Sequence, residues 1–250
     1  MKKGLVSVII PYYKKKKYFF NSFNSAYNQT YKKKEIIIIY DDENLNDLNY
    51  IKKITKNKKN IKIIINKNNI GAGYSRNAGI MKSQGEYIAF LDSDDLWHKD
   101  KLNIQINYMI DKKINFTFSS YKIIDKKNKT IGLRKADKFI NYQNLLHSCD
   151  IGLSTVVLKK NLLNKKTRFP NIKTKEDYVL WLLLVKKQIK LYGIDKYLAK
   201  WRKTEGSLSS NTFQKLNDGF IVYKKYMNFN YIKSFYYLFI FSLNFLKKTF

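Results

Sequence analysis

Residues 35–42 have the sequence EIIIIYDD, in which four consecutive isoleucines lead directly to two acids. A run this apolar is typical of a parallel strand that is covered on both faces. A second strand-like run, Glu86–Leu91, is followed by the acids Asp92, Asp94 and Asp95. Because the carboxyl ends of parallel strands lie at one edge of a sheet, we expect the two acidic clusters to lie close together.

Strand and helix signals alternate on both sides of these runs. The apolar run Val6–Ile10 stops at Pro11 and predicts a buried first strand. The other signals of the first half are a helix over Tyr18–Tyr27, an amphipathic helix with Leu45, Leu48, Ile51 and Ile54, a strand over Ile61–Ile65 and a helix over Gly73–Ser83. The alternation predicts an α/β fold whose parallel strands are joined by right-handed crossovers.

The pattern is looser after about residue 100. It predicts a helix over Lys101–Ile110, strand structure over Phe116–Ile124, a helix over Glu176–Gln188, a strand pair or edge strand over Lys190–Trp201 and an aromatic, helical tail from Phe220. Neither an internal repeat nor a linker is apparent, so we predict one domain with a C-terminal appendage.

The composition excludes several classes of protein. The single cysteine and the two histidines among 250 residues allow no internal disulfide and no cysteine or histidine metal cluster. The apolar runs are shorter than the about 18 residues of a membrane-spanning helix. No signal peptide is recognisable, so we expect a cytoplasmic protein.

The net charge of +30 comes almost wholly from lysine, since only four of the 49 basic residues are arginine. Proteins that read nucleic acids use arginine for paired contacts to phosphate and guanine, so we expect no nucleic-acid partner. Solvated lysine faces are the favoured interpretation, and attraction to an anionic membrane surface is the alternative. Anionic ligands such as sugar nucleotides also fit this charge.

The two acidic clusters can be interpreted in two ways. Aspartate and asparagine begin turns and cap helices, which would make each cluster structural. Two clusters at equivalent strand ends of a lysine-rich chain instead favour a site for Mn²⁺ or Mg²⁺ with oxygen ligands. The glycine-rich segment Gly71–Gly79 lacks the third glycine of a dinucleotide fingerprint, and we expect it to place Arg76 near a phosphate.

Five segments resemble the family 2 glycosyltransferases in order and spacing over about the first 110 residues, and Glu176-Asp177 before Trp181 extends the resemblance. The segments are Val6–Tyr13, Asn28–Tyr31, Glu35–Asp42, Ser75–Gly79 and Gly85–Asp95. The resemblance implies a GT-A fold with a Rossmann-like, mostly parallel sheet flanked by helices. It divides residues 1–218 into a nucleotide-sugar-binding half, 1–110, and an acceptor half, 111–218, followed by an aromatic helical tail, 219–250.

The resemblance also implies roles for the residues of the nucleotide site. The family segment that matches Pro11 and Tyr13 borders the nucleobase, and the acid that matches Asp42 hydrogen-bonds the base. The arginine that matches Arg76 approaches the diphosphate, for which its fixed donor fork is suited.

The remaining roles concern the metal and the reaction. Asp92-Ser93-Asp94 matches the family's DXD motif, in which Asp94 would ligate Mn²⁺ or Mg²⁺, Asp92 would lie near ribose and metal, and Ser93 would help to bind the nucleotide sugar. Asp177 matches the general base, and we expect the dipole of its helix to lower its pKa and keep it ionised. The helix-start interpretation of Glu176 and Asp177 is compatible with this role.

Two departures from the family pattern are visible. Glu43-Asn44 stands where members usually have Gly-Ser. Thr204, in the segment 202–209, stands where many members have a histidine, and we expect Arg202 or Lys203 to replace that charge.

The resemblance implies an inverting, metal-dependent transfer of a sugar from a nucleoside-diphosphate sugar to an acceptor hydroxyl. A UDP-sugar donor and a glycan or glycolipid acceptor of bacterial surface-polysaccharide or lipopolysaccharide synthesis are favoured. The alternative is a degenerate nucleotide-sugar-binding or scaffolding protein. The segment Tyr231–Phe250 predicts either an interfacial helix at the inner face of an anionic membrane or a helix packed on the catalytic domain.

Overall fold

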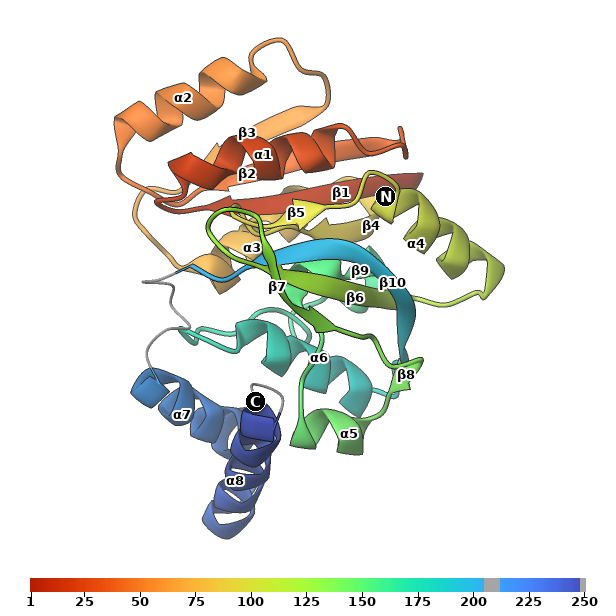
Figure 1. The fold of residues 1–250 in the computed structure, drawn as a ribbon, viewed down its shortest axis with the longest axis vertical. Coiled ribbons are helices and arrows are strands. Elements are labelled where there is room, and N and C mark those ends of the chain that lie inside the picture. Colours follow the sequence, from red (N-terminus) through yellow and green to blue (C-terminus); the bar gives the residue numbers. More distant parts are fainter. Residues whose placement is uncertain (205–211, 248–250) are drawn as a thin grey trace.

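The computed structural model describes residues 1–204 and 212–247. A ten-stranded sheet forms its centre, with eight strands in the order β3-β2-β1-β4-β9-β6-β10-β5, while β7 pairs with β6 and β8 with β10 (Figure 1). The four strands at one end of this order are β1 (Lys2–Tyr12), β2 (Lys34–Tyr40), β3 (Ile61–Ile65) and β4 (Gly85–Phe90). All four are parallel, as predicted.

The isoleucine run of β2 lies in the middle of this parallel unit. Ile37 pairs with Ile9 of β1, and Ile38 pairs with Ile10 of β1 and with Ile63 of β3. Side chains on both faces of β2 are buried, because Ile36–Ile39 are at most 2% exposed. The covering helices of this half are α1 (Lys16–Tyr27), α2 (Leu45–Thr55) and α3 (Ala72–Lys82).

One detail of the first half differs from the sequence expectations, and another shows what stands in place of the family's Gly-Ser turn. Strand β1 continues through Pro11 to Tyr12, because pairing with β4 stops at Ile9 and the missing N–H of Pro11 therefore breaks no ladder. The turn after β2 does depart from the Gly-Ser pattern. Asn44 is the N-cap of α2, and its side chain accepts hydrogen bonds from the amides of Asn46 and Asp47.

The other end of the sheet is mixed rather than mostly parallel. Strand β9 (Val157–Lys159) is antiparallel to β4 and to β6 (Phe116–Ile124), and it joins the two halves of the sheet. Strand β10 (Leu191–Arg202) is one interior strand and not a strand pair or an edge. It is parallel to β6 on one side and antiparallel to β5 (Leu96–Trp97) and β8 (Phe139–Ile140) on the other.

The remaining elements are connections and covering helices. They are α4 (Lys101–Asp111), β7 (Thr130–Arg134), α5 (Tyr142–His147), the 3-10 turns η1 (Leu153–Thr155) and η2 (Lys160–Leu162), and α6 (Glu176–Lys186). The chain ends in an antiparallel hairpin of α7 (Thr212–Ile221) and α8 (Tyr231–Lys247), joined through the π-helical turn η4 (Val222–Tyr226). Helix α7 runs across the predicted boundary at 218/219.

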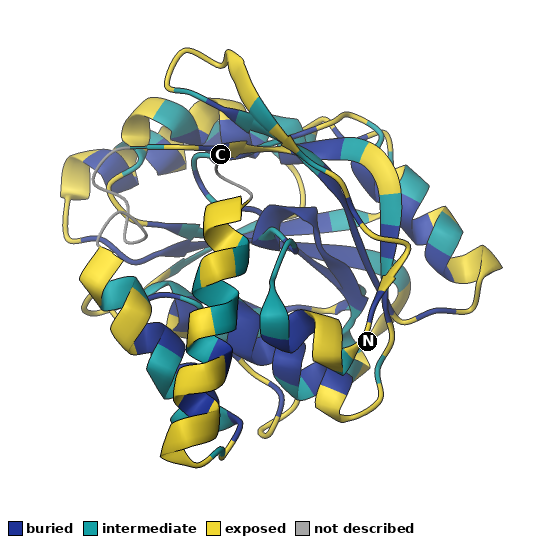
Figure 2. Cartoon of the chain, turned by 60° about the horizontal axis from the view of Figure 1, so that its bottom comes forward, coloured by how far each residue is buried: buried dark blue, intermediate teal, exposed yellow. Residues whose placement is uncertain are grey.

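The sheet separates two hydrophobic cores, and its strands are largely buried (Figure 2). One core includes Phe19 and Phe23 of α1, Ile51 of α2 and Ile106 of α4. The other core is built around Trp181 of α6 and also receives side chains from α5, η4 and α8. The C-terminal hairpin is therefore packed on the rest of the fold and does not extend freely from it. In residues 1–204 and 212–247, no helix is long and apolar enough to cross a membrane.

Gly79 marks the closest approach of α3 to the sheet. A Cβ atom at this position would lie 2.6 Å from Cγ2 of Ile9 and 3.3 Å from Cδ1 of Ile39. We expect Gly79→Ala to lower the free energy of unfolding by about 1–3 kcal/mol, because α3 must move off β1 even though alanine favours helix. Denaturant unfolding followed by circular dichroism measures the change.

The control is Met81→Ala on the same helix, whose side chain is 75% exposed. This variant should stay within about 0.5 kcal/mol of the parent. Equal stability of Gly79→Ala and the parent would contradict the packing described for α3.

Candidate active site

The acids after β2 organise the loops at the carboxyl edge of the sheet. The Asp41 carboxylate accepts hydrogen bonds from the amides of Ile70 and Gly71, 2.9 Å each, and from the Asn66 side chain. Gly71 has a φ of +83°, which glycine adopts without strain. Asp41 thereby fixes the loop that leads into α3.

Asp42 fixes the neighbouring loop. Its Oδ2 accepts from the amide of Lys14 at 2.8 Å, and its Oδ1 accepts from the amide of Glu43 at 2.8 Å. This carboxylate therefore ties the loop after β1, which carries the exposed Tyr13, to the loop after β2. Pro11, Tyr13 and Asp42 lie at the ends of adjacent strands, as expected from the sequence.

Arg76 connects the acid after β4 with the acid pair before Trp181. Its guanidinium donates to Oδ1 of Asp92 at 2.7 Å and to Oε1 of Glu176 at 2.5 Å, and it lies over the Phe169 ring. The side chain is 4% exposed, so its charge is compensated by the two carboxylates rather than by water. Through Glu176, Arg76 contacts a residue 100 positions further along the chain.

Asp94 forms an ion pair that the sequence analysis did not anticipate. Lys15 Nζ lies 2.7 Å from Oδ2 of Asp94 and donates to the Thr204 hydroxyl at 3.1 Å. Burial raises the pKa of Asp94, and the Lys15 ammonium opposes this change. Lys15 could not be distinguished in the sequence, since it is one of four consecutive lysines.

Asp95 is the most deeply placed acid of the cluster. Its Oδ2 accepts from the Ser154 hydroxyl at 2.6 Å, and its Oδ1 accepts from the Arg202 amide at 2.8 Å. Burial and the charges of Asp94 and Asp92 raise its pKa well above the usual range. The Ser154 hydroxyl also accepts a hydrogen bond from the Asp92 amide at 3.1 Å, and no sequence signal marked this residue.

Arg202 contacts the loop after β4. It is 3% exposed, and its guanidinium donates to the carbonyl oxygens of Asp94 and Asp125 and to the Asn128 side chain. These bonds hold that loop, and the electrostatic role expected for Arg202 or Lys203 stays a prediction. Lys203 is exposed, and residues 205–209 of the resembling segment lie outside the described residues.

The two acids expected on opposite sides of the reaction line one cavity of about 240 Å³. Asp92 comes from the end of β4 in the parallel part of the sheet, and Asp177 comes from the first turn of α6. Ser93 is 5% exposed and is not part of the lining. The rest of the lining is contributed by Asp95, Tyr121, Ile123, Arg134, Ser148, Cys149, Asp150, Gly152, Leu153, Ser154, Thr155, Ala199, Trp201, Phe241 and Phe245.

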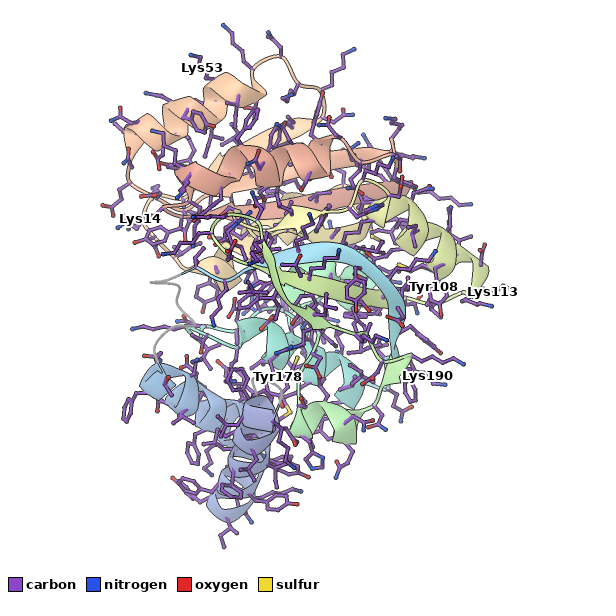
Figure 3. All side chains as sticks on the ribbon, in the orientation of Figure 1. Lys14, Lys53, Tyr108, Lys113, Tyr178 and Lys190 are labelled. Atoms are coloured by element: carbon purple, nitrogen blue, oxygen red, sulfur yellow. The ribbon has the colours of Figure 1, made fainter. Side chains whose placement is uncertain are left out.

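The helix that positions Asp177 is firmly anchored. Leu180, Trp181 and Leu184 are at most 1% exposed. Tyr178, next in the chain, donates to the Leu145 carbonyl at 2.8 Å and lies between α6 and the C-terminal helices (Figure 3). The backbone that follows the carboxylate is therefore held both by the core and by a hydrogen bond.

The expectation of a lowered pKa for Asp177 was wrong. Burial, and next the charge of Glu176, raise its pKa from 3.8 to about 7, although Arg76 and the Tyr178 amide act in the opposite direction. Desolvation of the carboxylate outweighs the dipole of the helix start here. A carboxyl group with this pKa can exchange a proton near neutral pH.

The acids after β4 are the candidate ligands of a divalent cation. Within the described ranges, no group of three or more histidine, cysteine, aspartate or glutamate side chains could hold a metal. Mg²⁺ and Mn²⁺ are commonly bound by one or two carboxylates together with substrate phosphates and waters. Asp92 and Asp94 match that number of carboxylates and lie on one loop after β4. In this structure they are paired with Arg76 and Lys15, whose cationic groups a metal ion would have to replace at the oxygens it binds.

The sheet, the acid cluster and the cavity define a glycosyltransferase of the GT-A class. The family model of glycosyl transferase family 2 matches residues 7–170, and the chain belongs to this family. It is 31% identical over 238 residues to the putative teichuronic acid biosynthesis glycosyltransferase TuaG of Bacillus subtilis, covering 93% of this chain and 92% of that protein. It is 37% identical to the UDP-Glc:alpha-D-GlcNAc-diphosphoundecaprenol beta-1,3-glucosyltransferase WfgD of Escherichia coli, covering 85% and 82%.

Solved structures agree on the fold. The structure of S. aureus TarS 1–349 in complex with UDP-GlcNAc superposes with a TM-score of 0.72 at 20% identity, covering 93% of this chain and 70% of that one. The mannosyltransferase PcManGT of Pyrobaculum calidifontis, in complex with GDP-Man and Mn²⁺, gives a TM-score of 0.70 at 12% identity, covering 93% and 69%. The GT-A fold expected from the sequence is confirmed.

The ion pairs of Arg76 generate a stability prediction. Arg76→Met leaves Asp92 and Glu176 facing each other without their shared cation, and we expect the free energy of unfolding to fall by about 3–5 kcal/mol. Adding Glu176→Gln should restore part of this loss. Denaturant unfolding measures both variants.

Arg168→Met is the matched control, because Arg168 is exposed. It should change the free energy of unfolding by no more than about 0.5 kcal/mol. If Arg76→Met proved as stable as this control, the cluster would not depend on the buried guanidinium.

Proposed function

We propose that this glycosyltransferase transfers a sugar from a UDP-sugar to an acceptor hydroxyl with inversion at the anomeric carbon. The observation that carries the proposal is the shared cavity of Asp92 and Asp177, which brings one acid of each half to a common space. The acceptor we propose is a glycolipid or glycan of surface-polysaccharide synthesis. The names of TuaG and WfgD, and the UDP-GlcNAc bound by TarS, support the donor and acceptor classes.

The donor would bind at the carboxyl edge of the parallel strands. We assign the nucleobase to the region of Pro11, Tyr13 and Asp42, where a base can lie between the loops that Asp42 ties together. The diphosphate would then extend toward Arg76 and the acids after β4. The buried guanidinium offers fixed donors to phosphate oxygens at this position.

Asp94, Asp92 and the intervening Ser93 form the proposed DXD motif. Asp94 and Asp92 would hold Mn²⁺ or Mg²⁺, which neutralises charge developing on the diphosphate leaving group when it is bound. Lys15 would then leave Asp94 and donate to a diphosphate oxygen. Thr204 stands where the family pattern often has a histidine. Its hydroxyl accepts a hydrogen bond from Lys15 and would keep this bond when Lys15 turns to the diphosphate.

Asp177 is the proposed general base. A hydroxyl is a weak nucleophile at neutral pH, so its proton must pass to a carboxylate as the new bond forms. Since single displacement places the acceptor opposite the leaving group, one base in the acceptor half suffices for inversion. We also propose that the enzyme works at the inner face of the membrane, where a lipid-linked acceptor would be found.

A metal prediction follows from Asp94. We expect Mn²⁺ together with UDP to raise the melting temperature of the parent, and we expect Asp94→Asn to remove this increase and the transfer activity. Asp111→Asn, on an exposed position of α4, is the matched control and should keep both. Full transfer activity of Asp94→Asn, or of the parent in EDTA, would overturn the metal assignment.

The pH dependence tests Asp177. Because its pKa is raised to about 7, the base is protonated in acid, and kcat/KM should increase from about pH 6 to about pH 8 before it levels off. Asp177→Asn should lower kcat by about 10²-fold or more with donor binding preserved. Release of UDP under saturating donor measures the rates.

Stability supplies an independent check with a worked sign. Below the unfolded-state pKa the carboxyl group is protonated in both the folded and the unfolded protein, so its raised pKa does not affect stability. As the pH rises from there to about 7, the unfolded chain loses this proton more readily than the folded one, and the free energy of unfolding falls. Above about pH 7 the loss of stability is complete. Asp177→Asn should therefore melt at a higher temperature than the parent at about pH 8 and at an equal one at about pH 4. A pH-independent rate, or a product that retains the donor's anomeric configuration by NMR, would contradict the proposed base.

A further inference from the structure

The hairpin of α7 and α8 carries an apolar stripe that nothing in the described chain covers. On α8 the stripe consists of six side chains at helical spacing, each 38% to 83% exposed: Ile232, Phe235, Tyr236, Phe239, Leu243 and Leu246. On α7 it continues with Phe213, 84% exposed, and Leu216, 43% exposed. Exposed residues run along both helices in Figure 2. We call this surface the hairpin stripe.

The charges around the hairpin stripe have one sign. Residues 212–247 contain five lysines and one acid, Asp218. Asp218 is 2% exposed and accepts two hydrogen bonds from Thr174, so its charge does not face outward. Three of the lysines, Lys215, Lys224 and Lys233, lie with their ammonium groups 4.3–5.6 Å from aromatic ring centres of the hairpin.

The opposite face of the hairpin belongs to the acceptor side of the active site. Phe241 and Phe245 of α8 line the cavity that holds Asp177. Lys175, the residue before the Glu176-Asp177 pair, has a left-handed φ of +66°, and its ammonium lies 4.3 Å from the Phe241 ring centre. Thr174 and Lys175 therefore fasten the loop of the base to α7 and α8.

We propose that the hairpin stripe binds the surface of an anionic lipid bilayer and thereby holds the acceptor cavity next to that surface. Aromatic and aliphatic side chains between lysines, without an exposed acid, match the interfacial and headgroup regions of such a bilayer. Helix α8 has 17 residues, and no described helix can span a membrane, so the hairpin lies on the bilayer. The link to an acceptor rests on the function proposed above, whereas bilayer binding does not.

The test is co-sedimentation of the full chain with vesicles rich in phosphatidylglycerol. The parent should bind these vesicles and should bind pure phosphatidylcholine vesicles at least about tenfold more weakly. Ile232→Glu combined with Phe239→Glu should weaken binding to the anionic vesicles at least about tenfold, because it places two acids in the stripe. Neither residue contacts the cavity, so a thermal melt equal to the parent's confirms that the fold is intact.

The matched control is Met81→Glu combined with Ile110→Glu, which makes the same charge change at exposed positions of α3 and α4. It should bind the anionic vesicles as the parent does. A parent that stays in the supernatant, or a stripe variant that sediments like the parent, would overturn the proposal. So would a parent dimer that the stripe variant dissociates in sedimentation velocity, since the occupant would then be a second copy.

Because vesicle binding is measured without donor or acceptor, its failure would leave the proposed transfer reaction untouched. Conversely, loss of activity in Asp177→Asn would not alter vesicle binding. The two proposals are therefore tested separately.

Discussion

The structure depends on keeping several carboxylates together where the two halves of the enzyme meet. Asp92, Asp94 and Asp95 follow one strand, and Glu176 approaches from the start of α6. The folded state offsets their repulsion with buried or half-buried cations, Arg76 and Lys15, and with hydroxyl and amide donors. Removing any one donor would leave a desolvated charge, which is far more costly than losing an exposed ion pair.

This constraint also links the parallel part of the sheet to the mixed part. Strand β9 continues the parallel unit into the second half of the sheet, and the Arg76 ion pair with Glu176 joins the two halves at the site itself. The loop before Asp177 is then fastened to the C-terminal hairpin through Thr174 and Lys175. The C-terminal hairpin thus forms part of the wall of the cavity that Asp92 and Asp177 share, because Phe241 and Phe245 of α8 line it.

The parallel half of the fold was predictable because its signals are local. The isoleucine run of β2 can be buried only between two layers, and the acids that follow it must leave the core at the strand's end. The second half was predicted poorly, and β10 was misassigned. The twelve residues of β10 contain no continuous apolar run. In the sheet, β10 pairs with β6 on one side and with the two short strands β5 and β8 on the other. Such pairings join distant segments, and no local pattern records them.

From the sequence alone we could predict the family, the presence of the parallel strands and the acids that could carry chemistry, since residue type and spacing along one strand or helix suffice for these. The ionisation of Asp177 and the partners of the other acids follow only from the tertiary structure. Whether Asp177 is ionised depends on how many atoms exclude water from it, and the structure reverses the expectation from its helix start by raising its pKa to about 7. The partners Lys15 and Ser154, and the engagement of Arg202, likewise follow from distances between segments that folding alone brings together.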